Sequence, residues 1–569
     1  MRRIDLRNNI MPLVLLVSFV LGTFCQVGGL PPTEAPEPVT YRFVRQAEPL
    51  GLFVEIVVPG GDRELTELVI EPHWGPVEKT TDSLADFTAH DADGQALEVT
   101  REAETSWTVS HEPGDEVTLR YRLVDGGPVG FRNRYKPVVR ESHFEIIGHV
   151  ALVRPAHCQL EVARPITIEW QGFEEEGWSA VCSWGTGFGP LQLEKPLREA
   201  LRAIYLAGDL EVARREVPGG ELVVARTKGE WRFTVDRLAD VAQGIVRAQR
   251  EFFRDDTDPY YLITMSPFEE RGGMGGTGLD VSFASFLHPD FDLDEGSDSA
   301  RRIEVLLAHE LFHHWNGGEI RLDQPEQLGY WFSEGFTDFY ARAILRQAEL
   351  MSDAERLDSL NELLLELWRN PEREAPNARI RDAFWTVRDV QRLPYLRGHL
   401  IAWLLDHHLR RASGGDRSLD EWMRAVWKET LAEDRRVETD WLLSRIERDA
   451  GEEMRARLER ILIDGRLPDL PDDLGGEGTR LTWKEQPSFD LGFDFERSQE
   501  ERRVCALDAG SAAEDAGLRE GQPLTSWSVH WGDIDRDVIM VVTGEDGTAE
   551  EIRYRPRSKE MLKIPVYVR

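Results

Sequence analysis

The run His309-Glu310-x-x-His313 contains the residue types of a hydrolytic metal site. On an α-helix, residues four apart lie on nearly the same face and are separated by about 6 Å of rise, so the two imidazoles point the same way. Glu310 lies between them on a neighbouring face, where its carboxylate can reach a water held by both rings. Zinc-dependent hydrolysis requires nitrogen ligands, an open coordination position and such a carboxylate. The spacing therefore predicts a zinc site with Glu310 as general base.

A catalytic zinc site needs a third protein ligand, and Glu334 is the best candidate. It belongs to residues 331–340, a predicted helix on which Asp338 follows Glu334 by one turn. Asp338 can accept the remaining N–H of a zinc-bound histidine, which fixes the tautomer of the ring and raises its basicity. The alternative is that His309 and His313 are ordinary helix histidines, since the HExxH pattern also arises by chance. The two carboxylates at helical spacing favour the zinc site.

Helices are predicted around these residues. The segment 303–312 is mostly apolar and fits a buried helix, and an amphipathic helix is predicted over 235–253. After Glu334 the chain is predicted to be helical to about residue 467, with amphipathic segments at 353–368, 398–412 and 419–431. These helices would support the metal site from behind.

Four segments together resemble one known family. Residues 309–316 and 331–340 are similar to the metal-binding part of the M61 zinc peptidases, the glycyl-aminopeptidase group within the gluzincins. Residues 395–398 (Tyr-Leu-Arg-Gly) resemble the family's Tyr-x-Lys-Gly element, and residues 414–421 resemble its Gly-Gly…Ser-Leu-Asp-Asp stretch. The resemblance implies a zinc-dependent aminopeptidase that favours small N-terminal residues. An endopeptidase with the same chemistry and a catalytically silent peptide-binding protein remain as alternatives.

Tyr395 is predicted to open a helix directly after Pro394, a position from which a phenol can project into a cleft. By the family resemblance, its hydroxyl donates a hydrogen bond to the oxyanion of the tetrahedral intermediate. Tyr395 and Glu310 are therefore the two predicted catalytic residues.

A glycine-rich segment spans residues 271–280 and indicates a backbone that turns tightly or is closely approached. It lacks the lysine, spacing and helix of a phosphate loop, and we interpret it as an edge along the substrate backbone. The resemblance implies substrate binding by Gly275, Gly276 and Gly278, and a contact between Asp280 and the substrate α-ammonium. An aspartate and a valine stand where the family pattern Gly-Leu-Glu-His has its last two residues. The alternative is that Asp280 only caps a turn.

The C-terminal part resembles a PDZ domain in two places, residues 491–493 (Leu-Gly-Phe) and 504–521. In that family the first segment accepts a peptide as an added strand, and backbone N–H groups hold its terminal carboxylate. Gln522 replaces the usual closing aspartate. A C-terminal peptide ligand and a purely structural domain are both open interpretations.

The 569 residues are too many for one hydrophobic core, and several domains are expected. Short alternating runs between residues 40 and 196, separated by Gly, Pro and Asp turns, favour an antiparallel sandwich or saddle. The predicted fold class is multidomain α+β, with an N-terminal β-sandwich or saddle, a thermolysin-like α/β plus helical catalytic domain and a C-terminal PDZ-like β domain. The predicted boundaries are a signal peptide at 1–29, a Pro-rich linker at 30–39, the β domain at 40–200, the catalytic domain at 201–467, a linker at 468–480 and the PDZ-like domain at 481–569.

The N-terminus combines three arginines with an uncharged apolar run at 10–25, which is typical of a secretory signal. The run is short for a membrane-spanning helix. We expect export to the periplasm or the exterior, with an uncleaved anchor or lipidation at Cys25 as alternatives. In an oxidising compartment Cys158 and Cys182 could pair, and the sequence leaves that bridge open.

The net charge of −35 disfavours binding to nucleic acid or anionic lipid. Peptides or proteins are therefore the expected substrates, Zn²⁺ is the expected cofactor, and any membrane contact would be made through the N-terminus.

Overall fold

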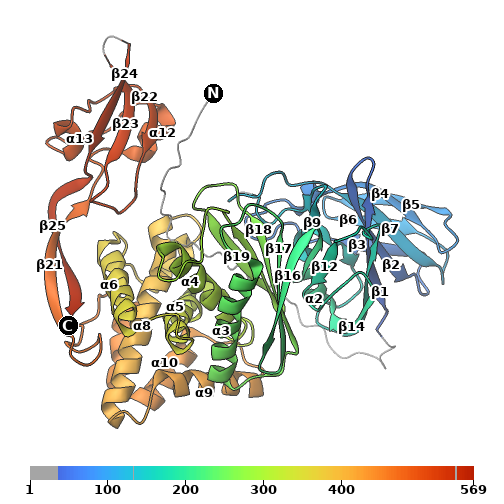
Figure 1. Ribbon diagram of the computed structural model, residues 1–569, viewed down its shortest axis with the longest axis horizontal. Coiled ribbons are helices and arrows are strands. Elements are labelled where there is room, and N and C mark those ends of the chain that lie inside the picture. Colours follow the sequence, from blue (N-terminus) through green and yellow to red (C-terminus); the bar gives the residue numbers. More distant parts are fainter. Residues whose placement is uncertain (1–35, 132, 545–546) are drawn as a thin grey trace. The chain divides into compact units, whose positions relative to one another are not determined.

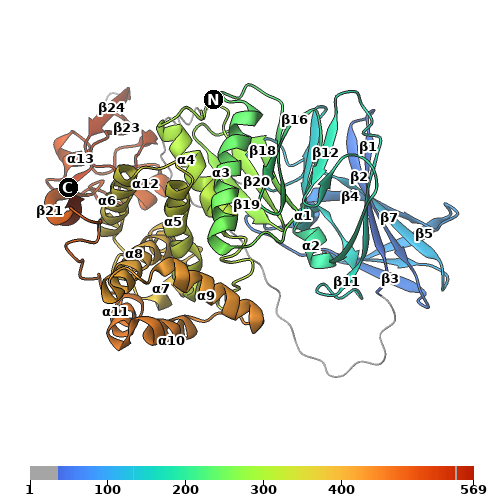
Figure 2. The same cartoon turned by 60° about the horizontal axis from the view of Figure 1, so that its bottom comes forward.

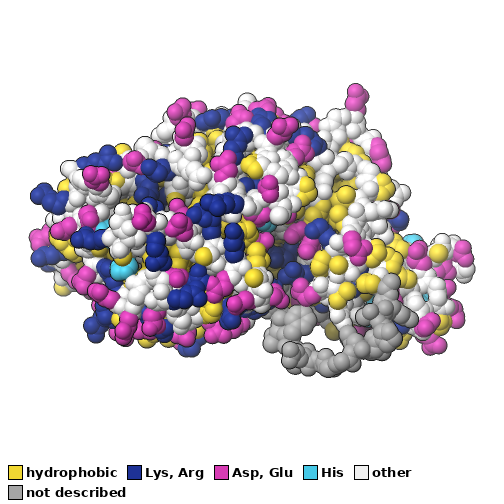
Figure 3. Space-filling model, turned by 90° about the horizontal axis from the view of Figure 1, so that it is seen from below, with side chains coloured by type: hydrophobic (Ala, Val, Ile, Leu, Met, Phe, Trp, Pro, Cys, Tyr) yellow, Lys and Arg dark blue, Asp and Glu magenta, His cyan; other side chains and the backbone are white. Residues whose placement is uncertain are grey.

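The computed structural model describes residues 36–131, 133–544 and 547–569. The predicted signal peptide and Cys25 lie outside the described residues. The described chain divides between residues 304 and 305 into two compact units. No helix among the described residues is both long and apolar enough to cross a bilayer. Acidic and basic side chains are both spread over the face seen in Figure 3.

The first unit begins with a ten-stranded sheet. Its strands are β1 (Val39–Gln46), β2 (Gly51–Pro59), β3 (Leu65–Val69), β4 (Leu84–His90), β5 (Ala96–Ala103), β6 (Ser106–Ser110), β7 (Glu116–Leu123), β10 (Arg154–Pro155), β11 (Ala163–Gln171) and β14 (Leu191–Pro196). The order is β10-β3-β6-β5-β4-β7-β2-β1-β11-β14, and neighbours are antiparallel except for the parallel pair of β1 and β11. Buried residues alternate along β1, because Val39, Tyr41 and Phe43 all face the core.

A second, five-stranded antiparallel sheet packs against the first. Its strands are β8 (Val138–Val139), β9 (His143–Ile147), β12 (Ser179–Cys182), β13 (Gly185–Thr186) and β15 (Ile204–Gly208), in the order β13-β12-β15-β9-β8. Short helices η1 (Thr80–Ser83), α1 (Gly148–Ala151) and α2 (Leu197–Leu201) connect the strands. One hydrophobic core contains residues of both sheets, such as Tyr41 and Val54 from the first and Phe144 and Tyr205 from the second. This shared core confirms the predicted β-sandwich. The two thiols of Cys158 and Cys182 are free.

The first unit continues into a third sheet that carries the glycine-rich segment. Its strands are β16 (Leu210–Val217), β17 (Gly220–Thr227), β18 (Tyr260–Pro267), β19 (Met274–Leu279) and β20 (Ser282–Leu287). The order is β16-β17-β18-β20-β19, which places β19 at an edge. Helix α3 (Val235–Phe253) links the parallel strands β17 and β18 and contacts β16 and β17 (Figures 1 and 2). Its bounds agree with the predicted helix.

Helix α4 (Asp298–Phe312) leads into the second unit, which is helical to residue 462. The helices are η2 (Glu326–Leu328), α5 (Tyr330–Gln347), α6 (Asp353–Arg369), α7 (Asn377–Ala383), α8 (Arg388–Ser413), α9 (Leu419–Ala432), α10 (Thr439–Ala450) and α11 (Glu452–Leu462). The prediction that Tyr395 opens a helix is wrong, because α8 begins at Arg388 and contains Pro394. A proline removes one backbone hydrogen bond from a helix. The buried side chains of Leu393 and Leu396 on either side offset that loss.

Helices α5 and α8 cross at two glycines. A Cβ atom on Gly398 would lie 1.8 Å from the Trp331 carbonyl oxygen, and one on Gly335 would lie 2.3 Å from the Gly398 Cα. Only glycine fits at both positions, because any larger residue would collide with the backbone of the other helix. The crossing fixes Glu334 and Asp338 on α5 relative to Tyr395 on α8.

The C-terminal part contains a ribbon of two antiparallel strands, β21 (Arg480–Phe489) and β25 (Arg557–Val568), and β25 contacts α6. A three-stranded sheet of β22 (Leu524–Ser528), β23 (Val538–Thr543) and β24 (Ala549–Tyr554) packs with α12 (Phe495–Glu501) and α13 (Ala512–Asp515). The structure differs from the PDZ pattern at one important point. Helix α12 directly follows residues 491–493, where peptide addition would need an edge strand.

Replacing Gly398 by alanine should destabilise the protein, since the new methyl group meets backbone atoms that cannot rotate away. Overpacking of this kind costs about 3 kcal/mol, which should lower the unfolding temperature measured by circular dichroism. Gly189→Ala is the matched control, because a Cβ atom there meets nothing within 4 Å. Equal unfolding temperatures for the two variants would contradict the tight crossing.

Candidate metal centre

The three predicted ligands meet at one buried point. The Nε2 atoms of His309 and His313 lie 3.0 Å apart, and Glu334 Oε2 lies 3.5 Å from each. Ligand atoms about 2.0–2.1 Å from a zinc ion at tetrahedral angles are about 3.4 Å from one another. The separations of these nitrogen and oxygen atoms therefore fit a zinc ion.

Hydrogen bonds fix the direction in which the two imidazoles present their lone pairs. His313 Nδ1 lies 2.8 Å from the Asn316 carbonyl oxygen, which can only accept, so this nitrogen carries the proton. His309 Nδ1 donates in the same way to Asp338 Oδ1 at 3.1 Å. Both Nε2 atoms then present lone pairs to each other and to the Glu334 carboxylate. Such an electron-rich arrangement is repulsive unless a cation or a proton lies between the three groups.

The end of α4 places His313 in the centre. The helix ends at Phe312, and the His313 N–H then donates to the Glu310 carbonyl at 3.2 Å, which is a tighter turn than the α-helix. Glu310 is almost fully buried, at 1% exposure, and so are His309, His313 and Glu334. The predicted ligands and the predicted base are therefore held in a site with little access for bulk water.

The two acidic residues of α5 stay ionised in this site. Burial favours the neutral acid, but the imidazoles of His313 and His309 lower the pKa of Glu334 to about 2. For Asp338, burial is likewise outweighed by the Arg342 guanidinium and by His309, which hold its pKa well below the usual range. At neutral pH both carboxylates are therefore ready to interact with a cation or a protonated nitrogen.

Tyr395 lies beside the first histidine. Its ring stacks with the His309 ring at 6.3 Å between centroids and 20° between planes. Burial and the nearby Glu334 carboxylate raise the pKa of the Tyr395 phenol well above its usual range. The hydroxyl therefore keeps its proton and can act as a hydrogen-bond donor.

The comparison with protein families is decisive for the chemistry. Residues 302–386, which include the histidines and both carboxylates, match the family model described as M61 glycyl aminopeptidase. The chain is therefore similar to the M61 peptidases over this segment. It is a zinc metallopeptidase, because M61 is a family of zinc peptidases and the buried donor set fits that ion.

Three solved structures are similar to parts of this peptidase or to most of it. An aminopeptidase N family protein from Idiomarina loihiensis is similar over 93% of this chain and 98% of its own, with 16% identity and a TM-score of 0.72. An M1 zinc metallopeptidase from Deinococcus radiodurans matches 77% of this chain and 95% of its own, with 16% identity and a TM-score of 0.46. Yeast LTA4 hydrolase covers 77% of this chain and 69% of its own, with 16% identity and a TM-score of 0.46. No curated protein matches the chain.

The first of these matches confirms the coarse fold of the peptidase. A TM-score of 0.72 over nearly the whole chain shows a shared multidomain α+β architecture with a large β-rich part and a helical part. At 16% identity it shows the fold alone.

The predicted substrate-binding residues of the peptidase belong to the first unit. Gly275, Gly276 and Gly278 lie on the edge strand β19, and a Cβ atom on Gly276 would lie 2.4 Å from the Phe283 ring. Asp280 follows the strand. Its carboxylate has partners that the sequence did not reveal, because Oδ2 accepts from Trp184 Nε1 at 2.7 Å and lies 3.6 Å from Lys195 Nζ.

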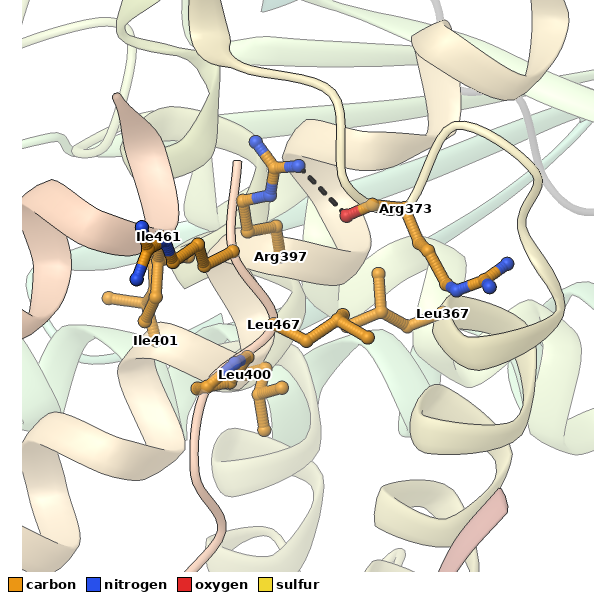
Figure 4. Close-up of a pocket in the computed structure, with 9 residues that line it drawn as sticks. Leu367, Arg373, Arg397, Leu400, Ile401, Ile461 and Leu467 are labelled. Carbon is orange, nitrogen blue, oxygen red and sulfur yellow. Dashed lines mark hydrogen bonds between the residues drawn. The ribbon is translucent and has the colours of Figure 1, made fainter. Parts of the chain in front are cut away.

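Arg397 occupies the lysine position of the Tyr-x-Lys-Gly element. Its side chain points to a different side of α8 from that of Tyr395. Residues two apart on a helix face nearly opposite sides. Arg397 is almost fully buried and donates to the Arg373 carbonyl oxygen at 3.1 Å (Figure 4). It also donates to the Ala375 carbonyl oxygen at 2.6 Å. The pocket in Figure 4 is lined by Leu367, Arg373, Arg397, Leu400, Ile401, Ile461, Arg466, Leu467 and Pro468. Its mostly aliphatic walls offer no metal ligand, so we do not assign it to the hydrolytic centre.

Asn316 is a supporting residue whose contacts the sequence did not predict. Its fully buried amide donates to the carbonyl oxygens of Phe332 and Ser333 at 3.2 and 3.1 Å and to Thr337 Oγ1 at 3.0 Å. The backbone carbonyl oxygen of Asn316 accepts a hydrogen bond from His313 Nδ1. One residue thus ties the histidine turn to the helix that carries Glu334. Its position three residues after His313 was the available signal.

Replacing Asn316 by alanine should loosen this link and weaken zinc binding about tenfold to a hundredfold, the range for residues that support metal ligands. Competition with a chromophoric chelator measures the effect on the apparent zinc dissociation constant. His407→Ala is the control. His407 lies on another part of α8, where it pairs with Asp473, and its replacement should leave the zinc dissociation constant unchanged. An unchanged constant in the Asn316 variant would refute the supporting role.

Proposed function

We propose that the peptidase hydrolyses peptide bonds at a zinc ion held by His309, His313 and Glu334. The observation that carries this assignment is the convergence of two imidazole lone pairs and one carboxylate at separations of 3.0 and 3.5 Å. Zinc bound there would polarise the scissile carbonyl and make the attacking water more acidic. Asp338 keeps His309 in the tautomer that presents Nε2.

Glu310 is the proposed general base. Its carboxylate lies on α4 between the two histidines and accepts the proton of the attacking water. It then delivers that proton to the leaving amine, so that one residue serves both steps. General acid–base catalysis of this kind contributes about 10²–10⁴ in rate.

Tyr395 is the proposed electrophilic partner. Its hydroxyl, protonated at neutral pH, would donate to the carbonyl oxygen as negative charge develops there. The stacking against His309 supports this role, since it places the phenol next to the ligand set.

Glu310→Gln should retain zinc and lose at least about 10²-fold in kcat, because the amide cannot accept the proton. Metal analysis and a peptide digest of the same preparation measure the two quantities together. The matched control is Glu349→Gln, a change in the turn after α5. Turnover at the wild-type rate with Glu310→Gln would refute the assignment of the base.

For specificity, we propose an exported aminopeptidase that removes small N-terminal residues. The family match and the open face of the edge strand at Gly275 support it, since a Cβ atom there meets nothing within 4 Å. The basic start and apolar run of the N-terminus support export.

One observation favours an endopeptidase as the second candidate. Trp184 and Lys195 already engage Asp280 Oδ2. A carboxylate that remains neutralised by its own lysine would not select for a free amine.

Paired peptides with free and N-acetylated ends should separate the two candidates. If Asp280 binds the α-ammonium, acetylation should lower kcat/KM by about 10² or more, and Asp280→Asn should remove most of that preference. Glu194→Gln, at an exposed carboxylate next to Lys195 in the chain, is the control for a general change of charge in this region. Equal cleavage of both peptides by the wild-type enzyme would establish the endopeptidase instead.

A further inference from the structure

Asp338 accepts two charged or polarised donors at a single oxygen atom. Its Oδ1 lies 3.1 Å from His309 Nδ1 and 2.7 Å from Arg342 Nη1. Arg342 follows Asp338 by one turn of α5, so both side chains lie on the same face of that helix. The carboxylate that orients a metal ligand is thus itself held by a cation.

The Arg342 guanidinium is anchored by further contacts. Nη1 also donates to the Asp338 carbonyl oxygen at 2.9 Å, and Nε donates to Ser359 Oγ on α6 at 3.3 Å. Its side chain is only 20% exposed, and the Asp338 side chain is 15% exposed. The guanidinium is therefore fixed between two helices, unlike an exposed arginine that exchanges partners freely.

Burial makes this contact more important than an ordinary ion pair on a helix surface. Exposed pairs one turn apart are weak, because water screens both charges. A buried carboxylate without a full counter-charge is costly, and a neutral imidazole supplies only one hydrogen bond. Arg342 supplies this counter-charge, since its Nη1 lies 2.7 Å from Asp338 Oδ1.

We propose that Arg342 is a positioning residue of the zinc centre. It holds Asp338 Oδ1 at the His309 Nδ1–H, and through that bond it keeps the Nε2 lone pair directed at the metal. The inference rests on the proposed function, in which His309 is a zinc ligand. In this arrangement Arg342 contacts neither the metal nor the substrate, and it affects the zinc affinity through Asp338 and His309.

Removal of the guanidinium should weaken zinc binding. In Arg342→Met, Asp338 loses the donor that fixes its rotamer, and His309 is then oriented by a looser partner. Residues that hold metal ligands typically contribute about 10–100-fold to metal affinity. Arg342 acts through Asp338, so the expected loss is about tenfold, near the lower end of that range.

The test is chelator competition on the full chain, with zinc as the only probe. Arg342→Met should raise the apparent zinc dissociation constant about tenfold, and Arg342→Lys should recover part of it, because an ammonium can still donate to Oδ1. Arg346→Met is the matched control, since Arg346 lies one turn further along α5 and pairs with the exposed Asp353. Unfolding temperatures of the zinc-free variants provide a second measurement.

An unchanged zinc dissociation constant in Arg342→Met would overturn the inference. A lower unfolding temperature of the zinc-free variant, found together with that unchanged constant, would make Arg342 a link between α5 and α6 only. Failure of the catalytic assignment has a different signature, because an active Glu310→Gln enzyme would leave the zinc measurements untouched. If Arg342→Met does not fold, the comparison of Arg342→Lys with the wild type and Arg346→Met decides in the same way.

Discussion

In the second unit, three electron-rich atoms face one another in a buried space, and the surrounding contacts hold them in place. Two imidazole nitrogens and a carboxylate oxygen at 3.0–3.5 Å repel one another unless a cation or a proton lies between them. The polypeptide holds them there with hydrogen bonds on the far side of each ring, from the Asn316 carbonyl and from Asp338. The fold therefore supplies the geometry, and the ion relieves the repulsion.

Two separate sets of contacts maintain the positions of these three atoms. Asn316 connects the turn after α4 to the backbone of α5 through three hydrogen bonds. The glycine crossing then fixes α5 against α8, because Gly335 and Gly398 allow backbone atoms to meet directly. The hydrogen bonds of Asn316 set the positions of the ligands relative to one another, and the glycine crossing sets the position of Tyr395 relative to the ligands. Loss of either should alter the geometry of the metal centre although no ligand is replaced.

Sequence reasoning worked where the controlling interactions are local. The bounds of α3 follow from apolar periodicity, and the approach of His309 to His313 follows from the helical spacing of residues four apart. It failed where distant packing decides. Helix α8 continues through Pro394 because its neighbours are buried, and α12 forms where the motif suggested a strand edge. The partners of Asp280 come from residues more than 80 positions earlier, which no local pattern reveals.

The position of Lys195 shows how an occupied carboxylate can still serve a free amine. Lys195 pairs with Glu199 as well as with Asp280, so its ammonium bridges two acids. A substrate ammonium could replace it at Asp280 while Lys195 remains paired with Glu199, and no charge would be left isolated. The incoming amine adds one positive charge to this group of side chains, because Lys195 stays beside it at Glu199. The preference for a free amine then depends on how strongly Glu199 holds Lys195 after Lys195 has left Asp280. Two carboxylates set that preference, rather than Asp280 alone.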